Sequence, residues 1–319
     1  MSIKVKILSS DADLQRFYAL SDSKGDVFSS KNWLACFDDA VVVGFIRQDE
    51  SLAAAAILHR AKLRFLSLVH PLPFSPHCAL ILEERQSNPA EKLSFRKEIL
   101  SAFAEFLLSE KASLHDLSLP PYIVDTQPFI WKKFQVRPAY TYRVDLSEEP
   151  EKIAAHFAPR LRNSIRKEQG LYTVQDADTT SAFELIHSTL LRNGLRPDAA
   201  AMKAIIANSH HQGWGFGLIA KEGDQSVAAI WIIGDGNEAH YLFGGTKEGG
   251  GGPGFLLFEA IKKLRNQGYR ILDLEGSMQP GIEQFFRSFG AEMTPYYRIR
   301  KASLGVELLL RLLKPELWR

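Results

Sequence analysis

A glycine-rich turn between a short apolar run and a helical segment restricts the fold of this chain more than any other feature. The apolar run covers residues 239–243, and the turn covers residues 249–254, which include four consecutive glycines. In the segment that follows, apolar side chains recur at helical spacing and charged or amide side chains occupy the opposite arc, until Gly268 ends the segment. This order predicts a strand, a loop and a helix that lies on a sheet.

A second strand is expected directly after that helix, over residues 271–275. Because side chains alternate across a strand, Asp273 and Glu275 should share one face, and Leu272 and Leu274 the other. The sequence therefore predicts two carboxylates on the same side of the sheet, with Glu275 nearer to the end of the strand.

The glycine turn has two interpretations. Where a loop leads into the first turn of a helix, unpaired N–H groups and the positive end of the helix dipole create an anion site, and phosphate is the obvious ligand. The alternative is a flexible connection that binds nothing. Neither G-x-x-x-x-G-K-[ST] nor a dinucleotide-binding G-x-G-x-x-G pattern is present, so the two common phosphate-loop folds are not indicated.

Composition excludes several classes of protein. With 319 residues, 45% hydrophobic and 24% charged, the chain is globular and long enough for two domains. A net charge of +2 predicts no DNA partner, and any anion-binding surface has to be local. Cys36 and Cys78 fit neither a disulfide framework nor a zinc site. The first residues lack the apolar region of a signal peptide and no run is long enough to span a membrane, so we expect a cytoplasmic protein.

The chain divides by its pattern of elements. Strand-like runs on both sides of one long helix predict an α+β unit over residues 1–146. A change in composition at residues 147–150 begins a second unit, which we expect to extend to residue 302. Residues 303–319 form an apolar run too short to span a bilayer, and we expect them to be a C-terminal helix packed on the body or on a partner chain.

The second unit should open with a helix over about residues 151–169 that carries the densest positive charge in the chain. This charge is either a solvated helix face, with the side-chain stems lying on the core, or a surface that contacts an anionic donor or acceptor. The histidines at positions 70, 77, 210 and 211 are interpreted as structural or surface residues, and no metal site is expected. The clustered cations are Arg160, Arg162, Arg166 and Lys167.

The second unit has a specific order of expected elements: helices, then a meander of strands, then a loop, a helix, a strand, a helix and a strand. The segments that carry a resemblance are RLRNSIRKEQGLYTV, residues 241–245, 257–268, 273–277 and 285–291, and, in the first unit, FSSKNWL and FIWKKFQVRPAYTYRVDLS. In these segments and in their order the chain resembles the GNAT acyltransferase superfamily, and within it the FemABX-like branch of tandem GNAT-like proteins. The resemblance implies two α+β GNAT-like domains with mixed, largely antiparallel sheets, the first degenerate and the second catalytic.

The resemblance implies transfer of an acyl or aminoacyl group by direct attack of an amine, with acyl-CoA or aminoacyl-tRNA as donor and no metal. The amine would belong to a small molecule or a cell-envelope precursor. GNAT enzymes bind the CoA pyrophosphate with R/Q-x-x-G-x-G/A; here Gly252 and Gly254 match, whereas Gly249 replaces the arginine or glutamine. Lys247 could partly substitute, and Phe255 completes the expected cofactor-binding set. A tRNA-borne donor would give the basic helix a phosphate partner.

A carboxylate near the attacking amine is useful for either donor, because a strand-end carboxylate in a partly desolvated pocket can accept the proton. We expect Glu275 to be this acceptor-side carboxylate with Asp273 beside it, and Ser277 or a backbone N–H to stabilise the oxyanion. The alternative for both carboxylates is a structural ion pair or a helix cap. Tyr241 and Arg287 are candidate substrate-binding residues. The remaining functional alternative is a GNAT-shaped binding or scaffolding protein without activity.

Overall fold

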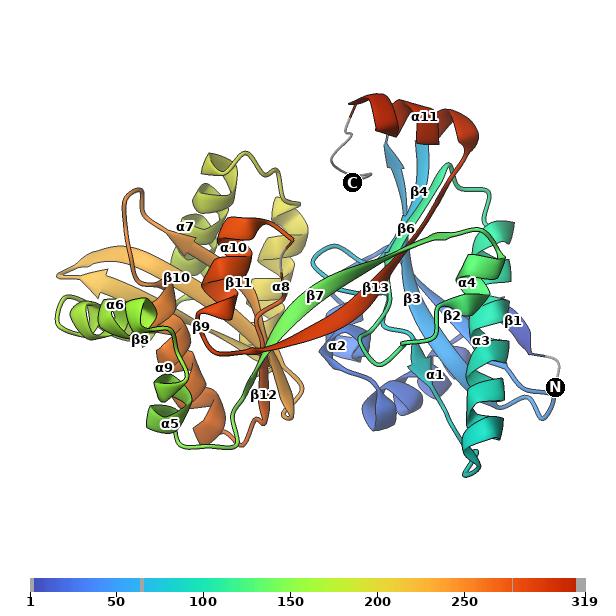
Figure 1. Cartoon of the computed structure of the whole chain (residues 1–319), viewed down its shortest axis with the longest axis horizontal. Coiled ribbons are helices and arrows are strands. Elements are labelled where there is room, and N and C mark those ends of the chain that lie inside the picture. Colours follow the sequence, from blue (N-terminus) through green and yellow to red (C-terminus); the bar gives the residue numbers. More distant parts are fainter. Residues whose placement is uncertain (1–2, 64–65, 277, 314–319) are drawn as a thin grey trace. The chain divides into compact units, whose positions relative to one another are not determined.

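The computed structural model describes residues 3–63, 66–276 and 278–313 (Figure 1). It contains two compact units, of which the first comprises Met1–Ala139 with Pro295–Arg319 and the second comprises Tyr140–Thr294. Two long strands, β7 (Gln135–Asp145) and β13 (Glu292–Ala302), run from one unit into the other. Compared with the sequence-based boundaries at 146 and 302, residues 140–146 therefore belong to the second unit and residues 295–302 to the first.

The first unit contains a mixed sheet with the strand order β1-β2-β3-β4-β6-β13, and β5 also pairs with β3. Its pairs are antiparallel except for β4 and β6, and a hairpin joins β2 to β3. The strands are β1 (Lys4–Ile7), β2 (Ala40–Ile46), β3 (Leu52–Leu63), β4 (Leu66–His70), β5 (Ile81–Leu82) and β6 (Leu114–Ser118). The helices are α1 (Asp11–Lys24), η1 (Val27–Ser29), α2 (Lys31–Leu34), α3 (Pro89–Ser109), α4 (Gln127–Trp131) and α11 (Leu304–Leu313).

The core of the first unit lies between α3 and the sheet. Phe95, Ile99 and Phe103 recur at helical spacing and are buried, and Phe103 packs edge-on against Phe45 of β2. The expected C-terminal helix is present as α11, whose Val306 is buried. The side chains of residues 309–313 and all of residues 314–319 lie outside the described part of the chain.

The second unit has the sheet order β7-β12-β11-β10-β9-β8. All of its pairs are antiparallel except for β11 and β12, which run parallel. The strands are β8 (Thr173–Asp176), β9 (Gly215–Glu222), β10 (Gln225–Gly234), β11 (Glu238–Thr246) and β12 (Ile271–Asp273). The helices are α5 (Pro150–Ala155), α6 (Pro159–Gln169), α7 (Thr179–Arg192), α8 (Ala199–His211), α9 (Pro253–Asn266) and α10 (Pro280–Arg287).

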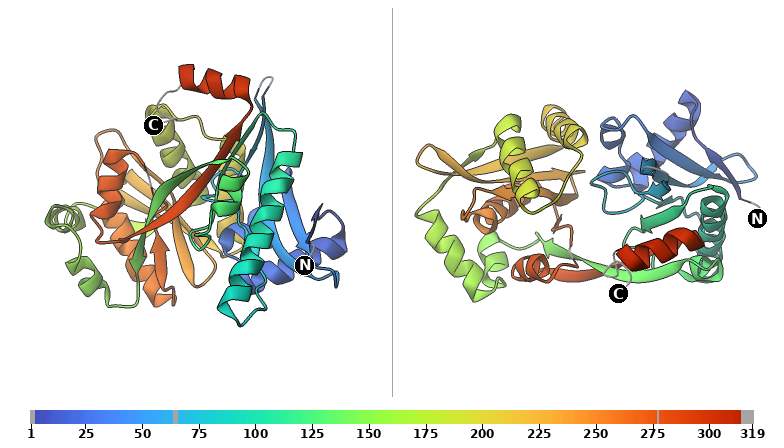
Figure 2. Two further views of the ribbon diagram at one scale, coloured as in Figure 1. Left: turned by 45° about the vertical axis from the view of Figure 1, so that its right-hand side comes forward. Right: turned by 90° about the horizontal axis from the view of Figure 1, so that it is seen from above.

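Helices cover both faces of this second sheet (Figure 2). On one face, the apolar stripe of α9 is fully buried against the alternate β10 residues Ala228, Ile230 and Ile232. On the other face, the indole N–H of Trp231 donates to the Ser209 hydroxyl of α8 at 2.9 Å. The amphipathic pattern of residues 253–266 thus correctly predicted a helix that lies on a sheet.

The expected helix over residues 151–169 is two helices, α5 and α6. The break falls before Pro159, which has no N–H to donate to the preceding turn and therefore begins a helix more readily than it continues one. The single-helix prediction was wrong for this reason.

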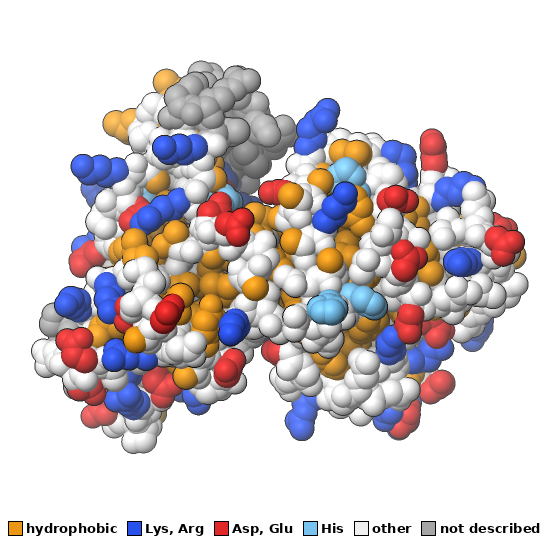
Figure 3. All heavy atoms as spheres, turned by 180° about the vertical axis from the view of Figure 1, so that it is seen from behind, with side chains coloured by type: hydrophobic (Ala, Val, Ile, Leu, Met, Phe, Trp, Pro, Cys, Tyr) orange, Lys and Arg blue, Asp and Glu red, His pale blue; other side chains and the backbone are white. Residues whose placement is uncertain are grey.

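Charges of both signs are mixed on the surface. On the face in Figure 3, lysine and arginine side chains are interspersed with aspartate and glutamate, as the net charge of +2 suggests. Within residues 3–63, 66–276 and 278–313, no helix combines the length and the apolar character that crossing a membrane requires.

Candidate functional site

The glycine turn forms one wall of a pocket at the N-terminus of α9. The pocket has a volume of about 530 Å³ and lies between α6, the turn and α10. Gly252, immediately before α9, adopts a left-handed conformation with φ of 110°, which glycine tolerates better than other residues. Gly252 and Gly254 both line the pocket, as expected for an anion-binding loop.

The other two residues predicted to bind a cofactor lie elsewhere. Phe255 is buried in the core between α9 and the sheet and does not line the pocket. The Lys247 ammonium donates to the Gln225 side chain at 2.8 Å on an exposed part of the surface. Only the glycines of the predicted set are therefore brought together.

The four clustered cations of the basic helix have different surroundings. Arg160 lines the pocket. The Arg162 guanidinium donates to the carbonyls of Ala155 and Phe157, at 2.6 and 2.9 Å, and so stabilises the break between α5 and α6. Arg166 and Lys167 are exposed and do not line the pocket.

Tyr241 and Arg287, the other two predicted substrate-binding residues beside the four cations, are both near α10. Arg287 lines the pocket, and its Nε donates to Glu283 at 2.8 Å, one helical turn earlier. Tyr241 packs edge-on against Phe286. Its side chain therefore lies on the same face of the sheet as α10.

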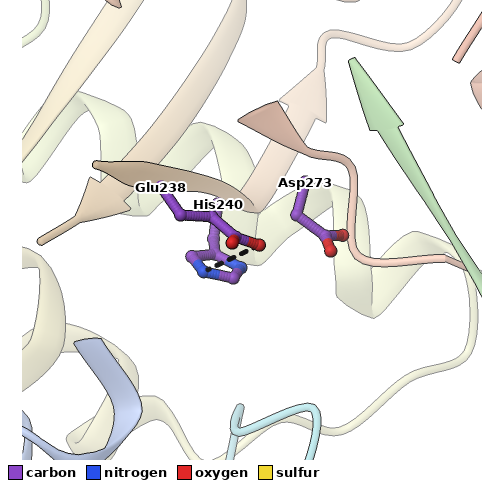
Figure 4. A group of neighbouring side chains, drawn as sticks. All are labelled: Glu238, His240 and Asp273. Atoms are coloured by element: carbon purple, nitrogen blue, oxygen red, sulfur yellow. Dashed lines mark ion pairs between the residues drawn. The ribbon is translucent and has the colours of Figure 1, made fainter. Parts of the chain in front are cut away.

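A group of charged side chains occupies the opposite face of the sheet. Glu238 and His240 alternate along β11, and the parallel register that places His240 opposite Asp273 of β12 brings the three side chains together (Figure 4). Their neighbours Ala239 and Leu272 point the other way, into the core beneath α9. The three ligand-type atoms lie within 4.8 Å of one another.

Glu275 joins this group by a different route from the one predicted. β12 ends at Asp273, and Glu275 has a left-handed φ of 59°, so strand alternation does not determine its direction. Its backbone N–H donates to Asp273 Oδ1 at 2.8 Å, and its carboxylate contacts His240 Nδ1 at 2.8 Å. The sequence predicted that Asp273 and Glu275 share one face of a strand that extends to residue 275. The strand ends at Asp273, so this prediction was wrong for the residues after it. Ser277 lies outside the described residues.

β7 supplies the remaining partners of the group. Arg143 pairs with Glu238, and its Nε lies 3.8 Å from Asp273. The Thr141 hydroxyl donates to Asp273 and accepts the N–H of Gly276 at 3.1 Å. Gly276 passes so close to β7 that a β-carbon there would lie 1.9 Å from the carbonyl oxygen of Tyr140. The turn that carries Glu275 is therefore fixed by its neighbours. We call Arg143, Glu238, His240, Asp273 and Glu275 the charged cluster.

The charged cluster holds its histidine in the protonated form. Burial alone would lower the pKa of His240, but the hydrogen bond to Glu275 and the charges of the carboxylates outweigh it and raise the pKa to about 9. Burial raises the pKa of Glu238 despite the attraction of His240 and Arg143. At neutral pH with the carboxylates ionised, three negative and two positive groups leave one net negative charge.

We expect the free energy of unfolding to fall by roughly 3 kcal/mol as the pH rises from 6.5 to above 9. Because the folded-state pKa of His240 is about 9 and its ordinary value is 6.5, the stabilisation is complete below pH 6.5 and is lost through this window. Burial lowers the pKa of His70 and His115, so these groups titrate below the window. Urea unfolding at half-unit pH steps measures the change, and a flat profile from pH 6.5 to 9.5 would contradict it.

The geometry also resembles a metal site, since two carboxylates and an imidazole converge. However, Arg143 pairs with Glu238, and Thr141 donates to Asp273. A cation would have to compete with the guanidinium and with the protonated form of His240. The ion-pair interpretation therefore explains more of the contacts.

The charged cluster lies beside the point at which β11 and β12 separate. The two strands pair only over residues 238–240 and 271–273. β11 then continues to Thr246, whereas Leu274 hydrogen-bonds to Tyr142 of β7 at 2.8 Å. A register shift between Trp231 and Ile232 adds a bulge to β11 at the same level.

No family model and no curated protein matches the sequence. Solved structures do match over nearly the whole length. FemX aligns with a TM-score of 0.65 at 14% identity, covering 97% of this chain and 99% of its own. The C-terminal domain of a putative lysylphosphatidylglycerol synthetase from Agrobacterium fabrum aligns with a TM-score of 0.60 at 13% identity, covering 95% of this chain and 96% of its own. A tandem GNAT protein from the clavulanic acid biosynthesis pathway aligns with a TM-score of 0.56 at 9% identity, covering 94% of this chain and 98% of its own. The chain has the tandem GNAT fold. This confirms the α+β tandem architecture expected from the order of motifs.

Sequence reasoning missed four polar residues that the GNAT fold brings to the two sites. Glu238 and His240 alternate in a strand, which was a usable signal that they share a face. Arg143 and Glu168 had no such signal, because their partners are far away in sequence.

Proposed function

We propose that the second unit of this tandem GNAT protein transfers an acyl or aminoacyl group to an amine by direct attack. One observation carries the proposal: a glycine-loop pocket and a carboxylate-rich cluster lie on opposite faces of one sheet, and the cluster lies beside the point where β11 and β12 part. A donor bound in the pocket would present its carbonyl carbon to an amine held on the other face.

The donor class is supported by the chemistry of the pocket. N–H groups of the first turn of α9 and the Arg160 guanidinium suit a phosphate-bearing donor. Of the solved structures with a similar fold, one is a tandem GNAT protein described as being without AcCoA. Another is the C-terminal domain of a putative lysylphosphatidylglycerol synthetase. We propose a CoA thioester or an aminoacyl-tRNA as donor.

Glu275 is the proposed acceptor-side group. The amine nitrogen attacks the carbonyl carbon, the bond from that carbon to the thioester sulfur or ester oxygen breaks, and the leaving group takes a proton. The nitrogen becomes strongly acidic once it has attacked, so a carboxylate can accept its proton. Glu275 is partly exposed, with 18% of its side chain accessible, and the net negative charge of the cluster attracts the ammonium form of the amine. The ammonium loses one proton to water before the neutral nitrogen attacks, and Glu275 accepts the second proton after the attack.

Catalysis is assigned to the second unit because the first lacks the corresponding loop. Residues 71–88, between β4 and α3, contain no glycine. The first unit is therefore proposed to be the degenerate copy, with a role in binding the acceptor or in stability.

A thermal-shift screen followed by a transfer assay tests the proposal. Acetyl-CoA, a long-chain acyl-CoA and aminoacyl-tRNA are screened first, because a ligand bound by the folded state raises its Tm. Donors that shift the Tm are then incubated with a panel of primary amines, and amide products are detected by mass spectrometry. If no donor stabilises the protein and no amide forms, the enzyme proposal is wrong.

Replacing Arg160 with alanine should weaken donor binding by about tenfold and reduce the slope of log Kd against log salt by about one. The reason is that Arg160 lines the pocket. Arg166 belongs to the same helix but does not line the pocket, so Arg166→Ala is the matched control. Equal losses in the two variants would indicate general electrostatic attraction rather than a contact.

A binding or scaffolding role is the second candidate. It is favoured by Gly249, which stands where the GNAT pattern has arginine or glutamine, and by a carboxylate that occupies the loop. Such a protein would bind an amine or an anion in the screen above and form no amide.

A further inference from the structure

The carboxylate of Glu168 occupies the glycine loop. Glu168 lies near the end of α6, and its Oε1 accepts the backbone N–H of Gly252 at 3.3 Å and the hydroxyl of Ser164 at 3.1 Å. It lines the proposed donor pocket together with the loop. An internal anion thus contacts the N-terminus of α9, where an external anion would bind.

The local sequence explains why a carboxylate from another helix fits there. α9 has no side-chain cap of its own, because glycine stands at the capping position, and Pro253 at the first helical position has no N–H. A β-carbon on Gly251 would lie 2.7 Å from Glu168 Oε1, so the glycine leaves the space that the carboxylate fills. Glu168 therefore satisfies the N–H of the capping residue itself and interacts favourably with the helix dipole.

We propose that Glu168 is a displaceable internal ligand of the loop, and that an anionic donor binds by exchanging a phosphate group for this carboxylate. The inference rests on the proposed donor site. Gly249 stands where the GNAT pattern has a cationic or amide side chain, so this position contributes no side chain to anion binding. The affinity of the loop for an anion is therefore determined largely by how readily Glu168 leaves. Arg160 and Arg287 stay in the pocket to balance an incoming phosphate.

Glu168→Gln separates the charge of this group from its hydrogen bonds. The amide oxygen can still accept from Gly252 and Ser164, so both hydrogen bonds are kept, and the lost interaction with the helix dipole should lower the Tm only slightly. The repulsion between carboxylate and phosphate is removed. At separations of a few ångströms and partial exposure, this repulsion should change the Kd by about tenfold.

The experiment titrates CoA and inorganic pyrophosphate into the full chain by calorimetry, at low and at high salt. We expect Glu168→Gln to bind both probes about tenfold more tightly than the natural chain, with a smaller difference at high salt. Glu151→Gln is the matched control, because it removes an exposed carboxylate of α5 that does not line the pocket. It should leave both affinities unchanged.

The outcomes distinguish this inference from the proposed function. If both probes bind the natural chain and Glu168→Gln equally well, Glu168 is not displaced and the inference fails, while the donor site stands. If Glu168→Gln binds more weakly, the carboxylate contacts the ligand directly, and the inference fails again. If no variant binds either probe, the loop is not an anion site, and the phosphate-based donor proposal fails with it.

Discussion

Glu275→Gln should fold normally and lose two to four orders of magnitude in kcat once a donor and acceptor pair is known. Glutamine keeps an oxygen that can accept the hydrogen bond from His240, at 2.8 Å in the natural chain, but it cannot take a proton. Because the loss is expected in the chemical step, KM for the donor should change little. Steady-state kinetics and a circular dichroism spectrum measure both expectations.

Asp273→Asn is the informative comparison. Asp273 is buried and accepts from Thr141 and from the Glu275 backbone, so it positions Glu275 rather than meeting the substrate. Its replacement should affect stability more than Glu275→Gln does. If Asp273→Asn loses activity while Glu275→Gln turns over within a few-fold of the natural chain, the two roles are reversed. If both variants remain active, the carboxylates are structural.

Patterns within one element predicted the fold well. The helix after the glycine turn and the strand after Gly268 follow from the periodicity of side chains and from the position of the glycines. Pro159 shows the limit, since a helical pattern continues through it although the backbone cannot donate a hydrogen bond there.

The candidate site was predictable only where its residues are close in sequence. Gly252, Gly254, Asp273 and Glu275 were found from their own segments. His240 meets Glu275 only because β11 and β12 pair in parallel across a helix, and Glu168 meets Gly252 only because α6 packs beside α9. Such pairings are set by tertiary packing, which one sequence does not reveal. The prediction for Arg162 was wrong for the opposite reason. Its local pattern of charge indicated a contact with an anionic substrate, whereas its guanidinium donates to backbone carbonyls of the same unit.

His240→Ala should lower the free energy of unfolding at pH 7 by about 3–5 kcal/mol. The imidazolium offsets carboxylates in a buried site, and its loss leaves Glu238, Asp273 and Glu275 with Arg143 as the one remaining cation of the charged cluster. The same change should lower kcat, because Glu275 loses the contact that orients it. The drop in stability between pH 6.5 and 9 should also disappear, since the group responsible has been removed.

His115→Ala is the matched control, because both histidines are 5% exposed. Burial lowers the pKa of His115, so this ring is neutral at pH 7 and its removal leaves a cavity and unmade backbone hydrogen bonds but takes away no charge. His240→Asn adds a second test, since its amide can donate to Glu275 in place of Nδ1 and should restore part of kcat without restoring the pH dependence. If His240→Ala is no more destabilised than His115→Ala and keeps the slope above pH 6.5, His240 is neutral in the folded protein. Arg143 would then be the one cation of the charged cluster.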